Sequence, residues 1–187
     1  MKKELILALR FTLVTTLVFG LIYPLVVTGL SKMLFPKQAA GSLIEKNGRV
    51  VGSKLIGQSF SADKYFHSRP SAAGTGYDAS ASSPSNLAPT NQALIDRVKS
   101  DVAKLQQENP GVPIPTDLVT ASGSGLDPEI SPAAAEFQIP RIAKARSMSV
   151  DSVRALVARH TQARTIGIFG EPRVNVLELN LDLDSLK

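Results

Sequence analysis

An uncharged run of twenty residues near the N-terminus constrains this chain more than any other feature. From Phe11 to Leu30 the sequence reads FTLVTTLVFGLIYPLVVTGL. As a helix, such a run extends about 30 Å, the thickness of the hydrocarbon core of a bilayer. Pro24 and Gly29 interrupt it, but both are tolerated in membrane helices. A cleavable signal peptide has an apolar region of only about 7–15 residues, so the run predicts a retained transmembrane anchor.

The charges beside this run indicate its orientation. Lys2, Lys3 and Arg10 precede it, whereas Lys32 and Lys37 follow it. Because basic flanks tend to stay in the cytoplasm, we predict a cytoplasmic N-terminus. The rest of the chain would then lie outside, in the periplasm or its equivalent.

Composition excludes several classes of function. The net charge is +5, of which residues 1–40 contribute +4 and residues 41–187 only +1. The basic character therefore belongs to the anchor, and the chain also has no Trp to stack on bases, which argues against nucleic-acid binding. The absence of Cys excludes disulfides, thiolate catalysis and Cys-ligated metals.

The predicted fold class is α+β, with a single N-terminal transmembrane helix followed by one extracytoplasmic α+β domain. Residues 1–36 form the anchor, whose transmembrane helix covers about residues 9–33, and residues 37–187 form the soluble domain. Within that domain, residues 67–90 are rich in Ser, Ala, Gly and Pro. Such a composition predicts a long loop.

Local signals predict the elements of the soluble domain. Asn47-Gly48 predicts a hairpin over residues 42–56, because this pair favours a tight two-residue turn. Apolar residues at helical spacing predict a helix over residues 91–109, capped by Thr90 or Asn91. The segment TDLVTA at residues 116–121 is interpreted as a short strand.

Three further elements follow in the C-terminal third. Ser131 is the expected N-cap of a helix that starts at Pro132, and Pro140 is expected to kink or split that helix. Another helix is expected from about Ser149. The segment VNVLELNLDLDSL at residues 174–186 alternates leucines with polar residues, which predicts a half-buried strand.

The sequence contains one short pattern that is typical of a catalytic site. Ser61 and Lys64 match the S-x-x-K pattern of hydrolases that use a lysine base, but no K-T-G or S-D-N companion is present. His67 and His160 are the two histidines, far apart and without metal-ligand spacing. A membrane-anchored Ser/Lys hydrolase therefore remains an alternative of another class.

The stretch SGSGLDPEIS at residues 122–131 combines flexible residues with a helix start. It lacks the Lys and the spacing of a P-loop, and Asp127 and Glu129 would repel an anion. We interpret it as a positioning loop in which Gly123 and Gly125 adopt backbone angles that other residues avoid. Asp127 would fix the following turn.

Several long segments resemble the KdpC family, which belongs to the Kdp-type potassium-transporting ATPase of bacteria. They are YFHSRPSAA at 65–73, SNLAPTN at 85–91, PTDLVTASGSGLDPEISPAAA at 115–135, FQIPRIAKAR at 137–146 and GEPRVNVLELNLDL at 170–183. The anchor with Tyr23-Pro24 and the segment FPKQAAGSLI at 35–44 are also similar to that family. Two departures stand out: Glu129 replaces a frequent His, and SSPSNL at 82–87 replaces S-G-G-S-N-L.

The resemblance implies an accessory, non-catalytic component of an ATP-driven, high-affinity potassium import complex in the bacterial inner membrane. Its partners would be the channel-like protein KdpA, the P-type ATPase KdpB, the small protein KdpF and membrane lipid. KdpB hydrolyses ATP through a D-K-T-G-T motif, which this sequence lacks. Potassium would be the transported ion, ATP would act through the complex, and we assign no cofactor to this chain.

The resemblance leaves two roles open. The chain would stabilise the assembly and cap the external mouth of KdpA, through six polar residues within these segments: Arg69, Asn86, Asp127, Ser131, Arg141 and Asn175. Alternatively it would assist ATP binding by KdpB, which the family links to a Gly/Ser loop and a downstream Gln. Those residues are Ser122, Gly123, Ser124, Gly125 and Gln138. ATP is cytoplasmic, so this second role conflicts with the predicted topology.

Overall fold

The structure is a computed structural model that describes residues 1–186. It combines helices with small sheets and divides into two compact units, Met1–Val51 and a domain that begins at Gly52. The apolar side chains of the first unit are mostly exposed, whereas the domain has a buried apolar core.

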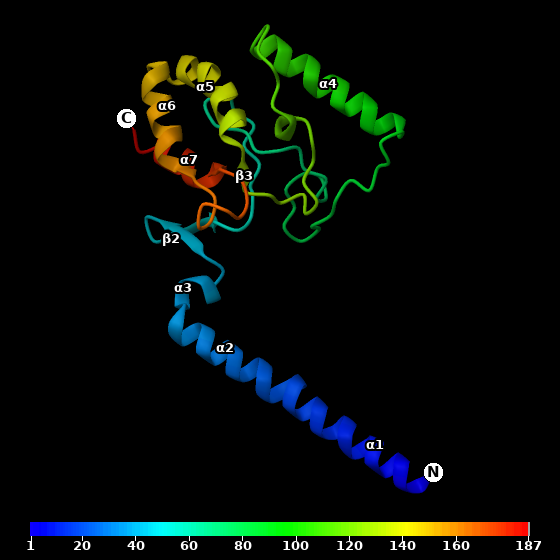
Figure 1. Ribbon diagram of the computed structural model, residues 1–187. Helices are drawn as coiled ribbons and strands as arrows, with labels where there is room; N and C mark the ends of the chain where they lie inside the picture. Colours follow the sequence, from blue (N-terminus) through cyan, green and yellow to red (C-terminus); the bar gives the residue numbers. More distant parts are fainter. Residues whose placement is uncertain (187) are drawn as a thin grey trace. The chain divides into compact units, whose positions relative to one another are not determined.

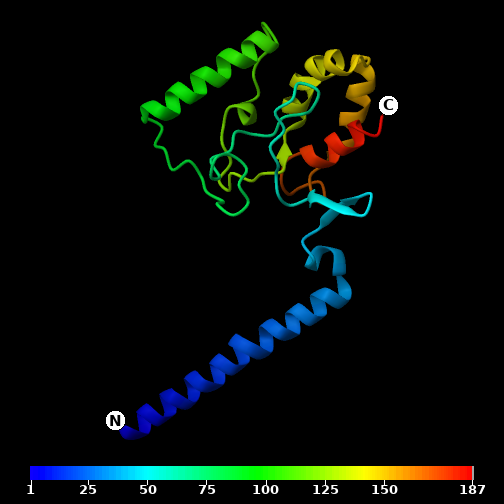
Figure 2. The same cartoon turned by 180° about the vertical axis from the view of Figure 1, so that it is seen from behind.

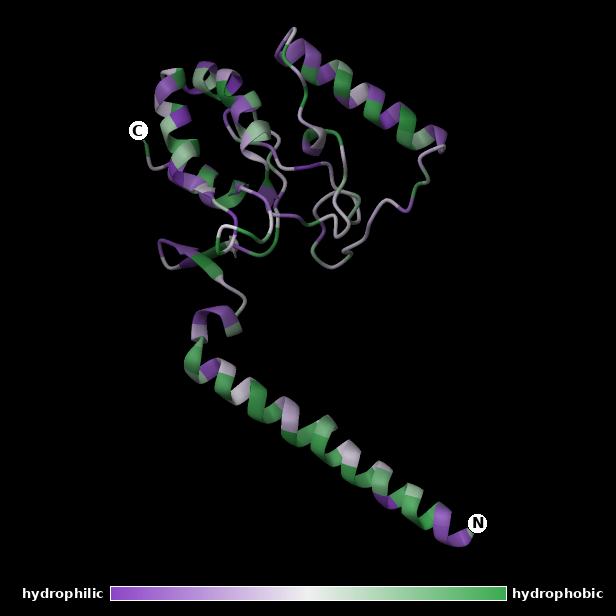
Figure 3. Cartoon of the chain, viewed as in Figure 1, coloured by the Kyte–Doolittle hydropathy of each residue, from purple (hydrophilic) through white to green (hydrophobic). Residues whose placement is uncertain are grey.

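The first unit contains one long apolar helix, Lys2–Leu34, the only candidate membrane span among the described residues. It consists of α1 (Lys2–Thr15), a π-helical segment η1 (Thr16–Ile22) and α2 (Tyr23–Leu34). Its surface is apolar over most of its length (Figure 3), and none of its residues is buried. In the π-helical segment the Tyr23 N–H donates to the carbonyl of Val18, five residues back. The helix thereby passes Pro24, which has no N–H to donate, without a break.

After α3 (Pro36–Ala39) the chain forms the expected hairpin from β1 (Leu43–Lys46) and β2 (Arg49–Ser53). Asn47 and Gly48 connect the strands with φ angles of 55° and 73°. Positive φ at both central residues is what a type I′ turn requires, and Asn-Gly adopts it readily. The prediction of this hairpin is confirmed.

The domain is built around a three-stranded antiparallel sheet of very short strands. Its order is β3 (Glu129–Ile130), β5 (Arg173–Asn175), β4 (Thr161–Gln162), with Val174 opposite both Ile130 and Thr161. Three helices pack beside it: α5 (Pro132–Arg146), α6 (Val150–His160) and α7 (Val176–Leu183). Figures 1 and 2 show α5 and α6 side by side, with α7 running next to α6.

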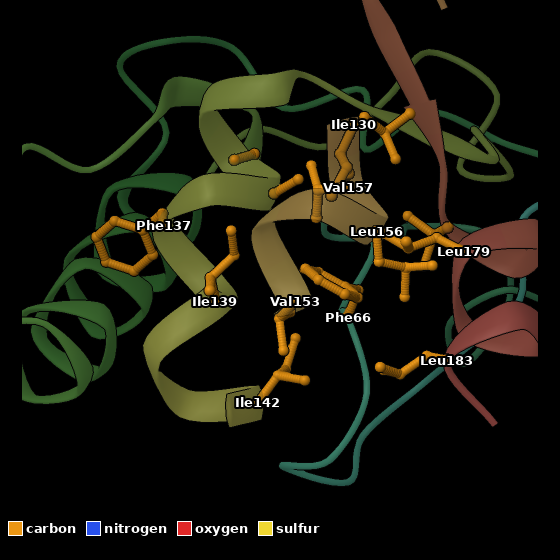
Figure 4. Close-up of a cluster of buried hydrophobic side chains, with 14 of the residues drawn as sticks. Phe66, Ile130, Phe137, Ile139, Ile142, Val153, Leu156, Val157, Leu179 and Leu183 are labelled. Atoms are coloured by element: carbon orange, nitrogen blue, oxygen red, sulfur yellow. The ribbon is translucent and has the colours of Figure 1, made fainter. Parts of the chain in front are cut away.

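The core lies between these helices and the sheet. Phe66, from the irregular segment that precedes α4, inserts among aliphatic side chains from α5, α6 and α7 (Figure 4). Its backbone is held by the Asn180 side chain, whose Oδ1 accepts from the Phe66 N–H at 2.9 Å while its Nδ2 donates to the Phe66 carbonyl at 2.9 Å. Asn180 is 1% exposed, so the amide supplies the hydrogen bonds that a neighbouring strand would otherwise give.

The long helix α4 (Gln92–Glu108) agrees with the prediction. Asn91 caps it, because its side chain accepts from the Ala93 N–H at 2.9 Å. The apolar face of α4 is half-buried, with Leu105 packed against the core. Residues 67–90, which precede it, contain neither helix nor strand.

Three local predictions are corrected. The segment 116–121 is not a strand: it contains a 3₁₀ turn, η2 (Thr116–Leu118). Of the two outcomes expected at Pro140, a kink or a split, the split is wrong, because α5 is one continuous helix to Arg146.

The third correction concerns the C-terminal strand, which is largely the helix α7. Its buried residues are Val176, Leu177, Leu179, Asn180 and Leu183, a helical spacing. Asn175 starts the helix by accepting from the Glu178 N–H, whereas only Arg173–Asn175 remain as strand. The alternation of leucines concealed this second periodicity.

Candidate functional site

An open groove of about 820 Å³ lies on the domain. Three of the predicted partner residues, Arg69, Asp127 and Ser131, meet in it. Two arginines and four carboxylates line the groove, which gives it a formal charge of −2. The lining residues come from four places in the chain: Arg69; Pro115–Asp117; Asp127, Glu129–Ser131 and Ala133; and Gly170–Arg173.

Asp127 joins the two loops that enter the groove. Its Oδ2 accepts from Arg69 Nη1 at 2.9 Å, and its Oδ1 accepts from the Glu129 N–H at 3.0 Å. The second contact is an Asx turn that directs the chain into β3. Arg69 also donates to the carbonyl and the hydroxyl of Thr120, each at 3.3 Å. This ion pair therefore connects residues that are 58 positions apart.

Ser131 performs the predicted capping and has a second role. Its Oγ accepts from the Ala134 N–H at 3.0 Å and donates to Asp117 Oδ1 at 3.1 Å. The Ser131 N–H donates to Asp117 Oδ2 at 2.7 Å. Asp117 thus binds the start of α5 with both oxygens. No sequence signal indicated this role, because Asp117 lies in a segment that resembled a strand.

A second ion pair crosses the sheet at the edge of the groove. Arg173 Nε on β5 donates to Glu129 Oε1 on β3 at 2.9 Å. Glu129, one of the two departures noted in the sequence, serves here as the partner of Arg173. Both arginines of the groove are therefore paired with carboxylates of the groove.

The Gly/Ser loop at residues 122–125 supports the long loop that precedes α4. The Ser124 carbonyl accepts from the Ser83 N–H at 3.0 Å, and the Gly125 carbonyl accepts from Ser71 Oγ at 2.6 Å. Gly125 has a φ of +67°, and a Cβ there would lie 2.7 Å from the Ala73 nitrogen. Ser122 is buried. Gly123 differs from the expectation, because its φ is not positive and its Cβ position faces open space.

Gln138 lies in α5 and is 1% exposed. Its Oε1 accepts from the His67 N–H and from Arg141 Nη2, both at 2.7 Å. Its Nε2 donates to the carbonyls of His67 and Ala134 at 3.1 and 3.2 Å. Gln138 thus holds the residue next to Phe66, so that two buried amides bind consecutive residues of one extended segment.

A second, smaller groove of about 370 Å³ runs between this segment and α4, and Gln138 lines it together with His67 and Glu108. None of residues 122–125 lines this groove. Burial, and then the positive charge of Arg141, lower the pKa of His67 below its ordinary value. His67 is accordingly a neutral side chain within the fold at neutral pH.

The remaining predicted partner residues lie apart from the larger groove. Arg141 donates to Glu108 Oε1 at 2.8 Å and to the carbonyl of Tyr65 at 2.9 Å, so it fastens the segment that carries Phe66. Asn175 caps α7 and donates to the carbonyl of Lys54 at 2.9 Å. Asn86 is exposed in the long loop with a φ of 53°.

The residues of the hydrolase alternative show a different arrangement. Lys64 Nζ lies 5.2 Å from the centre of the Tyr65 ring. Among the described residues, no hydrogen bond joins Lys64 to Ser61. The other histidine, His160, pairs through Nε2 with Asp182 Oδ2 at 2.9 Å.

A model of the family described as K⁺-transporting ATPase, c chain (KdpC) matches residues 5–185. The chain belongs to this family. In Koribacter versatilis, a potassium-transporting ATPase KdpC subunit is 59% identical over 98% of this chain and 95% of its own. Proteins of the same name in Methylobacterium nodulans and Rhodopseudomonas palustris (strain BisB18) are each 56% identical. These matches cover all of this chain and 96% and 100% of the two relatives.

Membership in the KdpC family confirms the resemblance found in the sequence. It makes the chain a subunit of a potassium-transporting ATPase, associated with the membrane through one candidate transmembrane helix. The matched residues include both the anchor and the domain, so both units are features of the family.

Proposed function

We propose that the chain is an accessory, non-catalytic component of an ATP-driven potassium import complex in a bacterial inner membrane. Its helix would cross the membrane with the N-terminus in the cytoplasm, beside the channel-like protein of the complex. Its domain would lie in the periplasm, stabilise the assembly and cap the external mouth of that channel-like protein. The other partners would be the P-type ATPase and the small fourth protein of the complex.

The observation that carries this proposal is the state of the charged groups in the larger groove. Arg69 pairs with Asp127, and Arg173 pairs with Glu129, while Asp117 binds the start of α5. Charged groups that are held in place on a surface can complement the charges of a partner protein. The formal charge of −2 fits a basic segment of the partner.

Asp127→Asn tests the groove as a contact surface. It removes one charge and the Arg69 ion pair, so we expect less of the chain to co-purify with the other subunits. Asp151→Asn is a matched control, because it breaks another 2.9 Å pair, with Arg154, outside the groove. Unchanged co-purification of the Asp127 variant, with a normally folded domain, would contradict a role of the groove in assembly.

The topology has a separate test. A reporter that folds only outside the cytoplasm, fused after Lys187, should be active. Activity of a cytoplasmic reporter at the same position would overturn the capping role and support the ATP-assisting one.

The ATP-assisting alternative is best tested at Gly123 rather than at Gln138. Replacing Gln138 would remove four hydrogen bonds inside the domain and confuse the result. Gly123 faces open space without a positive φ, so Gly123→Asp keeps the fold and adds a charge that repels phosphate. We expect an unchanged Michaelis constant for ATP in the assembled complex. A raised constant with full assembly would favour nucleotide contact.

The hydrolase alternative predicts that Ser61→Ala abolishes function. Because Lys64 lies over the Tyr65 ring, we expect this variant to retain growth at low potassium. Loss of growth in a variant that still assembles would favour the hydrolase.

A further inference from the structure

A small hairpin, Arg164–Glu171, projects between β4 and β5 and is called the 164–171 finger. Its backbone is fixed: the Thr165 N–H donates to the Phe169 carbonyl at 2.8 Å, and the Phe169 N–H donates back to Thr165 at 3.0 Å. At its base Arg164 Nη2 binds both oxygens of Glu171, at 2.6 and 2.7 Å. The finger is therefore a built element and not a loose connection.

The tip of the finger is apolar and exposed. Ile166, Ile168 and Phe169 are 83%, 71% and 64% exposed. Val112 and Val150, elsewhere in the domain, are single exposed apolar residues, which are normal on a protein surface. Three such side chains within four residues form a patch, and patches of this kind mark interaction sites.

The backbone conformation at the tip of the finger is one that its apolar residue, Ile166, does not favour. Ile166 and Gly167 have φ angles of 56° and 73°, nearly the same as Asn47 and Gly48 in the first hairpin. Asn tolerates this left-handed conformation, whereas a β-branched residue is a genuine outlier in it. Folding alone would favour Asn at position 166. The apolar side chain there requires an explanation outside the fold.

The charges beside the tip decide between a lipid and a protein as its occupant. A segment that inserts into a membrane surface usually carries free Lys or Arg and often Trp. Here Arg164 is paired with Glu171, Arg173 is paired with Glu129, and the chain contains no Trp. The N-terminal helix already provides a long apolar segment for the bilayer.

We propose that the 164–171 finger docks into an apolar pocket on the external side of the channel-like protein of the same ATPase complex. This rests on the proposed function as an accessory subunit. Residues Gly170–Arg173 at the base of the finger also line the larger groove, so the finger and the groove form one continuous surface. An apolar anchor beside a polar, charged rim is the usual composition of a protein interface.

The first test uses the full chain and the complex that lacks it. A double variant, Ile168→Ser with Phe169→Ser, removes most of the patch. Buried aromatic anchors dominate binding energies, so we expect affinity for the complex to fall about tenfold or more. Val112→Ser is the matched control, because Val112 is 46% exposed in a turn outside the finger, and it should bind normally. Normal binding of the double variant would overturn the proposal.

A second variant separates binding from folding. Ile166→Asn places in the finger the residue that the first hairpin has at the same backbone angles. The thermal stability of the domain should stay the same or rise, while affinity for the complex should fall. An Ile166→Asn chain that is more stable and binds equally well would show that the apolar tip has no partner.

A labelling experiment distinguishes the occupants. The chain has no Cys, so Phe169→Cys in the full chain carries a single environment-sensitive fluorophore. In vesicles of brominated lipid we expect no quenching, and adding the other subunits should shift the emission to the blue. Quenching by brominated lipid would identify a membrane contact and overturn the proposal. Neither readout depends on transport or on the reporter fusion, so the finger can fail while the accessory role stands.

Discussion

The anchor and the domain satisfy the backbone hydrogen bonds of an apolar segment in different ways. The Lys2–Leu34 helix satisfies its own hydrogen bonds and turns its apolar side chains outward. Phe66 is buried in a segment that is neither helix nor strand, and two side-chain amides, Asn180 and Gln138, satisfy the backbone of Phe66 and His67. Regular structure therefore makes the anchor tolerant of its sequence as long as it stays apolar. The irregular segment depends on individual polar residues.

Val18→Arg tests the membrane helix, and of all the variants we expect it to have the largest effect. Val18 lies in the middle of the helix, where an Arg costs about 2.5–3.5 kcal/mol on insertion scales. We expect the chain to be lost from the membrane fraction and from the complex. Val112→Arg places the same charge on the exposed surface of the domain and should be harmless. Normal membrane insertion of the Val18 variant would show that the helix does not span.

Asn180→Leu should destabilise the domain. The substitution leaves the Phe66 N–H and carbonyl buried without partners, at a cost of about 1–3 kcal/mol for each group. Chemical unfolding of the full chain in detergent measures this loss, and membrane insertion should remain normal. Gln107→Leu, on the exposed surface of α4, is the control. A stability equal to that of the control would contradict the role assigned to Asn180.

Gly125 and Gly123 offer a matched pair within one loop. Gly125→Ala would place a Cβ 2.7 Å from both the Ala73 nitrogen and the Ser83 oxygen, at a positive φ. We expect a loss of about 1–3 kcal/mol from this crowding. Gly123→Ala, with open space around its Cβ, should change the stability by less than about 0.5 kcal/mol. Equal thermal stabilities of the two variants would contradict the packing described for Gly125.

Ser131→Ala should have a smaller effect, because it acts at one helix end. Loss of an N-cap costs about 1 kcal/mol. Ser149→Ala removes the cap of α6, where Ser149 Oγ accepts from the Ser152 N–H and also contacts the Ser152 hydroxyl at 2.7 Å, but has no carboxylate partner as Ser131 has in Asp117. The Ser131 variant should therefore be the less stable of the two. Thermal unfolding of both chains decides whether the contact with Asp117 contributes.

The pH dependence of the domain should carry a contribution from His67. Because burial and Arg141 lower its pKa in the folded state, the unfolded state binds the proton more readily. Stability is therefore complete above the ordinary pKa of about 6.5 and declines as the pH falls below it. His67→Gln should flatten this decline between pH 7 and 5. An unchanged pH profile of the variant would assign the decline to other groups.

Local signals in the sequence predicted several elements correctly. The turn at Asn47-Gly48, the cap at Ser131 and the helix after Asn91 each depend on neighbouring residues. The helix α7 was missed because its leucines alternate as in a strand. A usable signal existed, since Asn175 followed by Glu178 three residues later is a typical helix start.

The candidate site was predictable only in part. Arg69, Asp127 and Ser131 lie in the larger groove, whereas the roles of Asp117 and Asn180 were not found. Asn180 binds a residue 114 positions away, and Gln138 binds one 71 positions away. Partners at such separations are set by the tertiary fold, and nothing in the adjacent sequence indicates them.

The contact between Phe66 and Asn180 also determines when, during synthesis of the chain, the domain can fold. The helix that begins at Lys2 is made first and can enter a membrane while synthesis continues. The core cannot close until α7, at the opposite end of the chain, has been made. For most of its synthesis the chain is thus a tethered polypeptide with an incomplete core, exposed to proteases and chaperones. A truncation of only the last dozen residues would leave it permanently in that condition.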